Sequence, residues 1–108
     1  MTEYKIEITL PAERDLFDIF TYITETLKEP QIEERIYTSI KREILTLSTM
    51  PERHRIVEEQ PYAAMGVRKL LVENYIVFYI VDKKSEIVSI LRVLYNRREW
   101  QRILGEDN

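Results

Sequence analysis

Residues 4–10 alternate between apolar and polar side chains. Tyr4, Ile6, Ile8 and Leu10 are separated by single polar residues. A period of two over such a run is typical of a β-strand with one buried and one solvated face. The sequence therefore predicts a first strand over residues 4–10.

Two amphipathic segments follow, in which apolar residues recur three and four positions apart. Pro11 fits the first turn of a helix, and the apolar spacing after it predicts a helix over residues 12–27. A second helix is predicted over residues 31–48, with its apolar stripe formed by Ile32, Ile36, Ile40, Ile44 and Leu47. The break at residues 28–30 is short, so we expect the two helices to be antiparallel neighbours.

Three β-strands are predicted after a loop that shows no clear period. The loop covers residues 51–65, the strands cover residues 67–72, 75–81 and 86–95, and turns are predicted at residues 73–74 and 82–85. The middle strand is apolar on both faces, so we expect it in the centre of the sheet. Turns this short leave no room for a crossover helix, and the three strands should therefore pair antiparallel.

The order of the elements predicts the fold class. A short last helix is expected over residues 97–104, with Trp100 towards the sheet and Gly105 at its end. The order strand, helix, helix and three strands predicts an α+β protein with helices on one face of a mostly antiparallel sheet. We expect residues 1–108 to form a single domain.

The composition argues against several kinds of functional site. The chain has no cysteine, one histidine and two glycines, so we expect no disulfide, no multi-histidine metal site, no glycine-rich phosphate loop and no cofactor. The net charge is −3, but residues 51–108 hold ten Lys/Arg against nine Asp/Glu, whereas residues 1–50 hold six against ten. Neither a signal peptide nor a bilayer-spanning apolar run is visible, which favours a cytoplasmic protein.

Four stretches of the sequence follow one another in a distinctive order and at distinctive spacings. They are Asp15-Leu16-x-x-Ile19-x-x-Tyr22-Ile23, then Leu47-Ser48-x-Met50-Pro51, then Gly66-Val67-Arg68-x-Leu70 with Asn74-Tyr75-Ile76-Val77-Phe78-Tyr79, and finally Leu91-Arg92-Val93-Leu94-Tyr95-x-Arg97-Arg98-Glu99-Trp100. Together they resemble the RelE/ParE superfamily of bacterial toxins over residues 4–104. The resemblance implies a RelE/ParE-like fold and the toxin half of a type II toxin–antitoxin pair.

This resemblance implies a partner but leaves the target open. We expect a cognate antitoxin, acidic and with a DNA-binding N-terminal half, that forms an oligomer with the toxin and covers an apolar and basic face on the helical hairpin and a sheet edge. ParE-type toxins poison DNA gyrase, whereas RelE-type toxins cut mRNA in the ribosome. A third alternative is a member that has lost toxicity and persists as a binding module.

A ribosome-dependent nuclease needs a base, a cation for the phosphate and an acid. Arg68 matches the family's strand arginine and is the first candidate cation, although it is equally consistent with a surface arginine lying along the sheet. Arg98 matches the arginines after the last strand. Tyr95 is a candidate stacking residue or acid, or else a half-buried core tyrosine. His54 lies in a loop between two arginines and is a candidate catalytic group, or else an ordinary surface histidine.

Three further strand residues bear on the mechanism. Lys69 should point to the face opposite Arg68, so the two should not line one site. Arg92 interrupts an apolar strand, which favours an ion pair over a catalytic role. RelE-type nucleases carry a catalytic arginine on the central strand at the position of Ile76. This replacement and the net charge of −3 favour the ParE-type mechanism over a metal-independent endoribonuclease.

Overall fold

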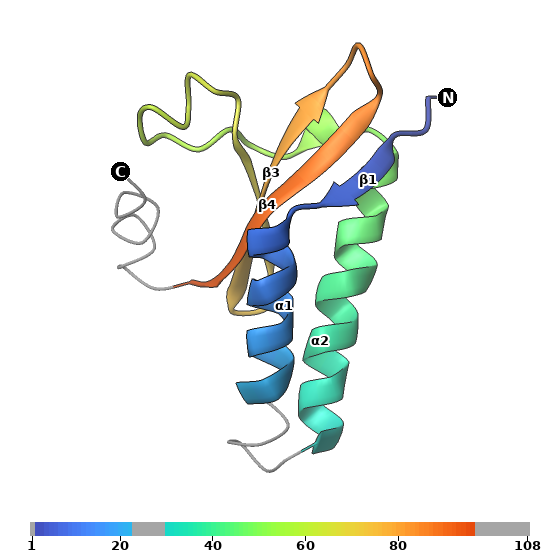
Figure 1. Cartoon of the computed structure of the whole chain (residues 1–108), viewed down its shortest axis with the longest axis vertical. Coiled ribbons are helices and arrows are strands. Elements are labelled where there is room, and N and C mark those ends of the chain that lie inside the picture. The colour runs from blue at the N-terminus through green and yellow to red at the C-terminus, as the bar shows by residue number, and fades with distance from the viewer. Residues whose placement is uncertain (1, 23–29, 97–108) are drawn as a thin grey trace.

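The computed structural model describes residues 2–22 and 30–96 (Figure 1). The predicted α+β class is confirmed. The elements in chain order are β1 (Lys5–Ile8), α1 (Leu10–Tyr22), α2 (Pro30–Leu45), two 3₁₀ turns η2 (Thr46–Ser48) and η3 (Pro51–Arg53), β2 (Arg68–Val72), β3 (Tyr75–Asp82) and β4 (Ile87–Tyr95). The last helix expected over residues 97–104, together with Trp100 and Arg98, lies outside the described residues, as does the end of the first helix at residue 27.

The first helix begins two residues earlier than predicted, at Leu10. Thr9 explains this start, because its Oγ1 accepts a hydrogen bond from the Ala12 N–H at 3.4 Å, and its own carbonyl accepts one from Glu13. The same hydroxyl lies 2.8 Å from the Ile90 carbonyl, to which it donates. Leu10 therefore belongs to α1 rather than to the strand, and its side chain is exposed.

The sheet has the strand order β1-β4-β3-β2. The predicted antiparallel pairing of the three late strands is confirmed, and β3 lies between β4 and β2 as its two apolar faces predicted. β1 pairs parallel with β4, from Lys5 opposite Ile87 to Ile8 opposite Ile90. A register shift between Phe78 and Tyr79 bulges the β3–β4 ladder.

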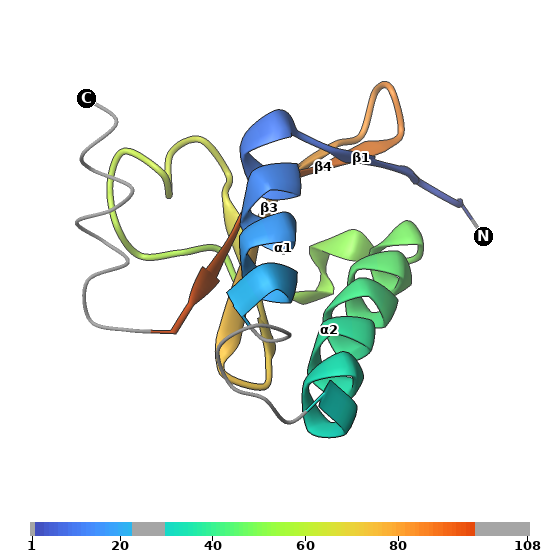
Figure 2. The same cartoon turned by 60° about the horizontal axis from the view of Figure 1, so that its bottom comes forward.

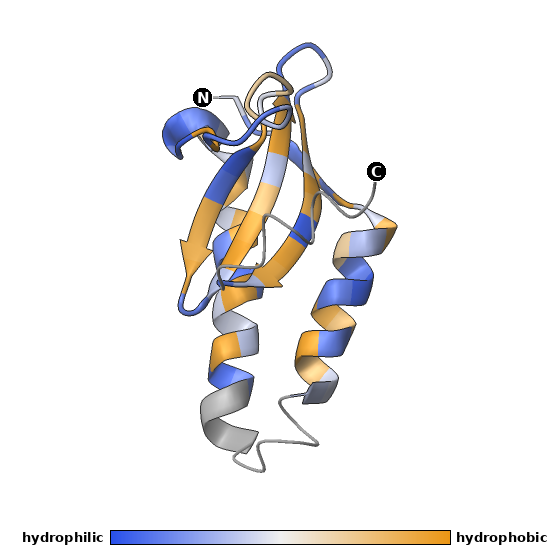
Figure 3. Cartoon of the chain, turned by 90° about the vertical axis from the view of Figure 1, so that its left-hand side faces the viewer, coloured by the Kyte–Doolittle hydropathy of each residue, from blue (hydrophilic) through white to orange (hydrophobic). Residues whose placement is uncertain are grey.

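Two apolar clusters cover the two faces of the sheet. The larger one packs α1 and α2 against the sheet and is centred on the fully buried Ile40, Leu47, Val77, Val88 and Ile90. The smaller one lies on the opposite face, where Val57 and Val67 cover Ile76, Phe78 and Leu94. In Figure 3 the strands are largely hydrophobic, whereas the helices alternate between hydrophobic and hydrophilic segments.

The helical hairpin lies on one face of the sheet, with α1 and α2 side by side in both views (Figures 1 and 2). The predicted stripe of the second helix is confirmed for Ile40, Ile44 and Leu47, which are all buried. The α-helix ends at Leu45 rather than Ser48, and a 3₁₀ turn completes the segment. No described helix has the length and apolar character needed to cross a bilayer.

The segment predicted as a loop has more structure than its sequence pattern suggests. It contains η3 and an isolated antiparallel bridge between Ile56 and Arg68. The Val57 N–H donates to the Val67 carbonyl at 2.9 Å, and the Val67 N–H donates to the Tyr62 carbonyl at 3.1 Å. These bonds use the backbone of Val67 outside the sheet, which explains why β2 starts at Arg68 rather than at residue 67.

Candidate functional site

A largely buried ion pair fixes α1 to β4. The Asp15 carboxylate accepts hydrogen bonds from Arg92 Nε at 2.7 Å, from Arg92 Nη2 at 3.1 Å and from the backbone N–H of Val93 at 2.9 Å. The side chains of Arg92 and Asp15 are only 23% and 12% exposed. The interpretation of Arg92 as a paired arginine is therefore confirmed, and its pairing is bidentate.

Arg68 holds the loop before β2 against the sheet. Its Nη1 donates to the carbonyls of His54 at 2.7 Å and Glu52 at 3.0 Å, and its Nη2 lies 3.7 Å from the Glu52 carboxylate. A phosphate at this guanidinium would have to compete with these contacts. Lys69 pairs with Phe78 of the smaller cluster, whereas Arg68 pairs with Tyr79 of the larger one, so the prediction that the two point to opposite faces is confirmed.

His54 is partly buried between the arginines of its loop and the sheet. Its Nε2 is shielded from solvent and has no hydrogen-bond partner among the described residues. Its ring meets the Tyr79 ring edge-on, with the centroids 6.4 Å apart. Burial lowers the pKa of His54 below 6.5, and the positive charge of Arg53 lowers it further. The imidazole is therefore mainly neutral at pH 7, with its free nitrogen directed into the protein.

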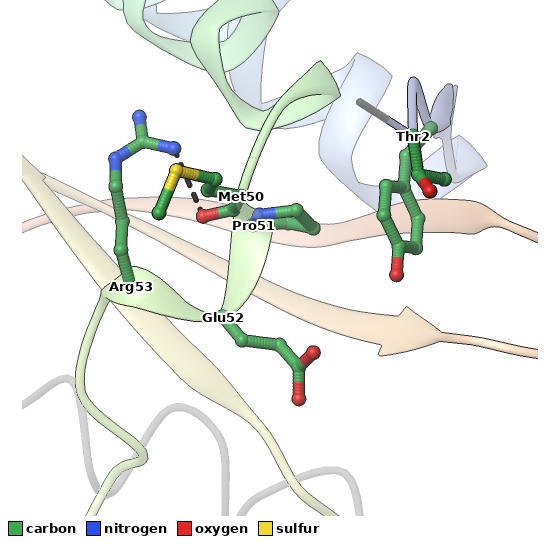
Figure 4. A pocket seen from close by; sticks show the side chains of 6 residues that line it. Thr2, Met50, Pro51, Glu52 and Arg53 are labelled. Atoms are coloured by element: carbon green, nitrogen blue, oxygen red, sulfur yellow. Dashed lines mark hydrogen bonds between the residues drawn. The ribbon is translucent and has the colours of Figure 1, made fainter.

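Tyr79 is a fixed buried tyrosine beneath this loop. Its hydroxyl donates a 2.6 Å hydrogen bond to the Pro51 carbonyl, and burial raises its pKa to about 12. Arg53 secures the same turn from the solvent side, because its Nη1 donates to the Thr49 carbonyl at 2.6 Å and the Met50 carbonyl at 3.1 Å. Figure 4 shows the Arg53 side chain folded back towards Met50. Tyr79 therefore holds this turn from the protein interior, and Arg53 holds it from the solvent side.

Tyr95 lies elsewhere, at the far end of the sheet. Its ring meets that of Tyr75 edge-on at 5.5 Å, and it is 44% exposed. In the sheet register Tyr95 pairs with Tyr75, whereas Arg68 pairs with Tyr79. Four residues along a strand separate the two positions by about 13 Å. The structure thus brings Arg68 and His54 together, keeps Tyr95 apart from both, and does not describe Arg98.

Tyr95 borders a groove of about 490 Å³ between the helical hairpin and the end of the sheet. Its remaining lining residues are Asp15, Asp18, Ile19, Tyr22, Ile36, Asn74, Tyr75, Val93 and Leu94. The lining is largely apolar and rich in tyrosine. The partner face expected on the helical hairpin and a sheet edge is apolar and basic, whereas the charged side chains at this groove are those of Asp15 and Asp18.

A smaller hollow of about 400 Å³ lies where the N-terminal segment passes the η3 turn. Thr2, Tyr4, Met50, Pro51, Glu52 and Arg53 line it. In Figure 4 the side chains of Glu52 and Arg53 leave the turn in different directions, so they do not converge on one ligand. Among the described residues that line this hollow, no acid, base and cation are arranged around one point.

Ile76, where the resemblance to RelE-type nucleases would expect an arginine, belongs to the core. Ile76 is 2% exposed and packs with Phe78 and Leu94 under the loop that contains Val57. A charged side chain there would have to displace this cluster or remain buried, which is costly without a partner. The two apolar faces of residues 75–81 predicted a central, covered strand, and the burial of Ile76 agrees with that prediction.

Asp15 and Tyr79 support the site through contacts that the sequence pattern does not predict. Asp15 opens the first of the four stretches that carry the resemblance, and only the packing of α1 along β4 reveals it as the acceptor for Arg92. Tyr79 lies in an apolar strand, where nothing in the pattern predicts that its hydroxyl binds Pro51. Local sequence gives no direct signal for either contact, because the partners lie 77 and 28 residues away.

Several solved structures with the same fold come from toxin–antitoxin systems. The chromosomal ParDE system of P. aeruginosa contains a chain with a TM-score of 0.70 and 20% identity, covering 90% of this chain and 100% of that one. For the M. tuberculosis RelBE2 complex the TM-score is 0.62 at 23% identity, covering 88% and 93%. Free E. coli RelE, in a mutant form with two arginines replaced by alanine, gives 0.63 at 11% identity, covering 96% and 92%. These likenesses establish the RelE/ParE toxin fold.

The sequence itself identifies the family. The model for the ParE toxin of the type II toxin–antitoxin system parDE matches residues 6–100. The chain therefore belongs to the ParE toxin family. Among curated proteins, none matches it at a significant level.

Proposed function

We propose that this ParE-family toxin arrests growth by inhibiting DNA gyrase through binding rather than catalysis. The observation that carries the proposal is the placement of the candidate nuclease groups. Arg68 is engaged by backbone carbonyls, Arg92 by Asp15, and Ile76 fills the position of the nuclease arginine with apolar core. Among the described residues, no base, cation and acid converge on one open site. Action on a protein target needs no such convergence.

A cognate antitoxin is the second part of the proposal. The groove bordered by Tyr22, Tyr75 and Tyr95 offers the apolar area that an antitoxin segment must bury to offset its ordering entropy. Asp18 has no side-chain partner among the described residues and lies at this groove. We therefore expect the bound segment to place a lysine or arginine near Asp18, even if the antitoxin is acidic overall.

An endoribonuclease remains the second candidate because His54 and Arg68 are adjacent. The Arg68 guanidinium contacts the His54 carbonyl, so one displacement of the loop would free both groups. Such a nuclease would act in the ribosome and would need no metal. If the chain is such a nuclease, Arg68→Ala would abolish mRNA cleavage. Lys69→Ala, on the opposite face of the sheet, would leave cleavage intact.

One induced culture distinguishes these mechanisms. The chain is expressed without antitoxin in E. coli, and DNA and RNA are extracted from the same samples. Gyrase inhibition predicts growth arrest with gyrase–DNA cleavage complexes and intact transcripts. Codon-phased mRNA cuts without cleavage complexes would overturn the gyrase proposal in favour of the nuclease. Normal growth with folded toxin present would identify a binding module that has lost toxicity.

A further inference from the structure

The outward side of α1 carries large apolar side chains that the fold does not bury. Ala12, Leu16 and Ile19 face the sheet and are buried, whereas Leu10 and Phe17 are 66% and 68% exposed. The last two are seven residues apart, almost two full turns, so they lie on the same side of the helix. A phenylalanine this exposed in an ordered helix is a feature of interaction surfaces when it forms part of a larger patch.

Two opposite charges lie between these apolar side chains. Glu13 and Arg14 occupy the turn between Leu10 and Phe17 on the same side of α1. Neither has a side-chain hydrogen bond or ion pair with another of the described residues. The order along the helix is thus apolar, acidic, basic, apolar. In an antiparallel second copy the order runs apolar, basic, acidic, apolar. The acidic position of each copy then lies opposite the basic position of the other, and apolar positions lie opposite each other.

We propose that α1 pairs with α1 of a second copy of the chain, antiparallel, about a twofold axis between Glu13 and Arg14. In this register Leu10 of each copy meets Phe17 of the other. Glu13 of each copy then meets Arg14 of the other, which makes two ion pairs for one helix pair. Such an interface is isologous, because both copies contribute the same surface. It is a self-association of the toxin, additional to its proposed activity.

This face is distinct from the tyrosine-lined groove. The groove uses Asp15, Asp18, Ile19 and Tyr22 on another side of the same helix. An antitoxin segment in the groove would therefore leave Leu10 and Phe17 accessible, and an antitoxin-bound toxin could still pair through α1.

The area available predicts a weak dimer. A helix of 13 residues presents less surface than the about 800 Å² per partner of a standard interface. Phe20 extends the apolar strip towards α2, where its ring lies 5.1 Å from that of Tyr37. The ion pairs are exposed and fix register more than they add affinity. We expect dissociation at about 0.1 mM, the range of transient complexes.

A lipid surface is a poorer occupant than a second copy. Helices that lie on membranes carry lysine and arginine along their polar face. The exposed charged residues of α1 are Glu13 and Asp18 against the single basic residue Arg14, because the Asp15 carboxylate is already paired with Arg92. Anionic headgroups would be repelled by this balance, whereas the alternating charges match a reversed copy of the same helix.

Charge reversal tests the register directly. The purified full chain is studied by sedimentation equilibrium from 10 µM to 1 mM, with Glu13→Arg, Arg14→Glu and the double variant, concentrations chosen to bracket about 0.1 mM. Each single reversal places like charges opposite each other twice and should weaken the dimer about tenfold. The double variant restores both pairs and should recover wild-type association. Mixing the two single variants should produce a heterodimer.

The outcomes separate the proposal from its alternatives. A wild-type chain that stays monomeric up to 1 mM, about tenfold above the expected dissociation constant, would overturn it. A dimer that none of the reversals weakens would also overturn it, because the contact would then lie elsewhere. Association only after the neighbouring gene's antitoxin is added would assign the face to that partner instead. Both reversals are at exposed positions, so unchanged thermal melts establish that each variant is folded.

Discussion

Removing the Asp15 carboxylate should destabilise the fold more than any comparable surface change. Asp15→Ala removes the carboxylate that binds Arg92 in this largely buried position, and it removes the acceptor of the Val93 N–H. Breaking a fully buried pair costs about 3–5 kcal/mol. Because Arg92 retains 23% of its side-chain exposure, we reduce the charge contribution to about 2 kcal/mol, and the lost backbone acceptor adds about 1 kcal/mol.

The expected total is a loss of about 3 kcal/mol in the free energy of unfolding. For a chain of 108 residues this corresponds to a decrease in Tm of about 13 °C. Urea unfolding followed by circular dichroism measures the free energy, and a thermal melt measures Tm. Asp15→Asn should lose about half as much, because the amide oxygen can still accept from Val93 while the negative charge is gone.

A matched control uses an exposed ion pair. Arg35→Ala removes one partner of the Arg35–Glu73 pair, whose atoms are 3.3 Å apart at the surface. The change should cost less than about 0.5 kcal/mol. A double-mutant cycle with Arg92→Ala should give a coupling of at least about 1.5 kcal/mol. If Asp15→Ala stays within about 0.5 kcal/mol of wild type, or the two changes are additive, the ion pair does not fix α1 to β4.

Three further predictions concern the loop over the sheet. Because the pKa of His54 is lowered in the folded state, the unfolded state binds more protons, and the free energy of unfolding should fall as the pH drops below 6.5. Tyr79→Phe should cost about 1–2 kcal/mol by leaving the Pro51 carbonyl unpaired. Burial raises the pKa of Tyr79 from 10.0 to about 12, so the free energy of unfolding should also fall as the pH rises above 10.0. In a spectroscopic titration at high pH, the absorbance change of Tyr79 should come last among the tyrosines.

These predictions for His54 and Tyr79 each have a control variant and a result that would contradict them. His54→Gln should abolish the loss of stability below pH 6.5, and an NMR titration of this single histidine with an unshifted pKa would refute the burial argument. Tyr4→Phe, at a tyrosine whose hydroxyl has no hydrogen bond to the described residues, should leave stability unchanged. Equal effects at Tyr4 and Tyr79 would show that the bond to Pro51 contributes nothing specific.

The sequence predicted the strands and helices where the apolar period was long and regular. The predictions from the apolar stripe between Ile36 and Leu47 and from the two apolar faces of β3 were correct. Burial on one or two faces imposes such a pattern directly. Element ends were less accurate. The start of α1 depends on the Thr9 cap, and the start of β2 depends on Val67 bonding to the preceding loop.

The candidate site was predictable in part only. The pairing of Arg92 followed from the cost of burying an unpaired charge, but its partner Asp15 lies 77 residues away and depends on how α1 packs. The separation of Tyr95 from Arg68 depends on strand register, which the sequence does not specify by itself. The engagement of Arg68 by the His54 carbonyl depends on the path of an irregular loop, for which no periodic signal exists.

The target of the toxin is tested most directly with purified DNA gyrase. Relaxed plasmid, gyrase and ATP are incubated with increasing amounts of the full chain, and supercoiled and cleaved products are resolved on a gel. Supercoiling should fall and gyrase-linked cleaved DNA should accumulate at micromolar toxin, with Lys69→Ala as a control variant. Unchanged supercoiling by folded toxin, together with codon-phased cuts in ribosome-bound mRNA, would contradict the proposal of gyrase inhibition.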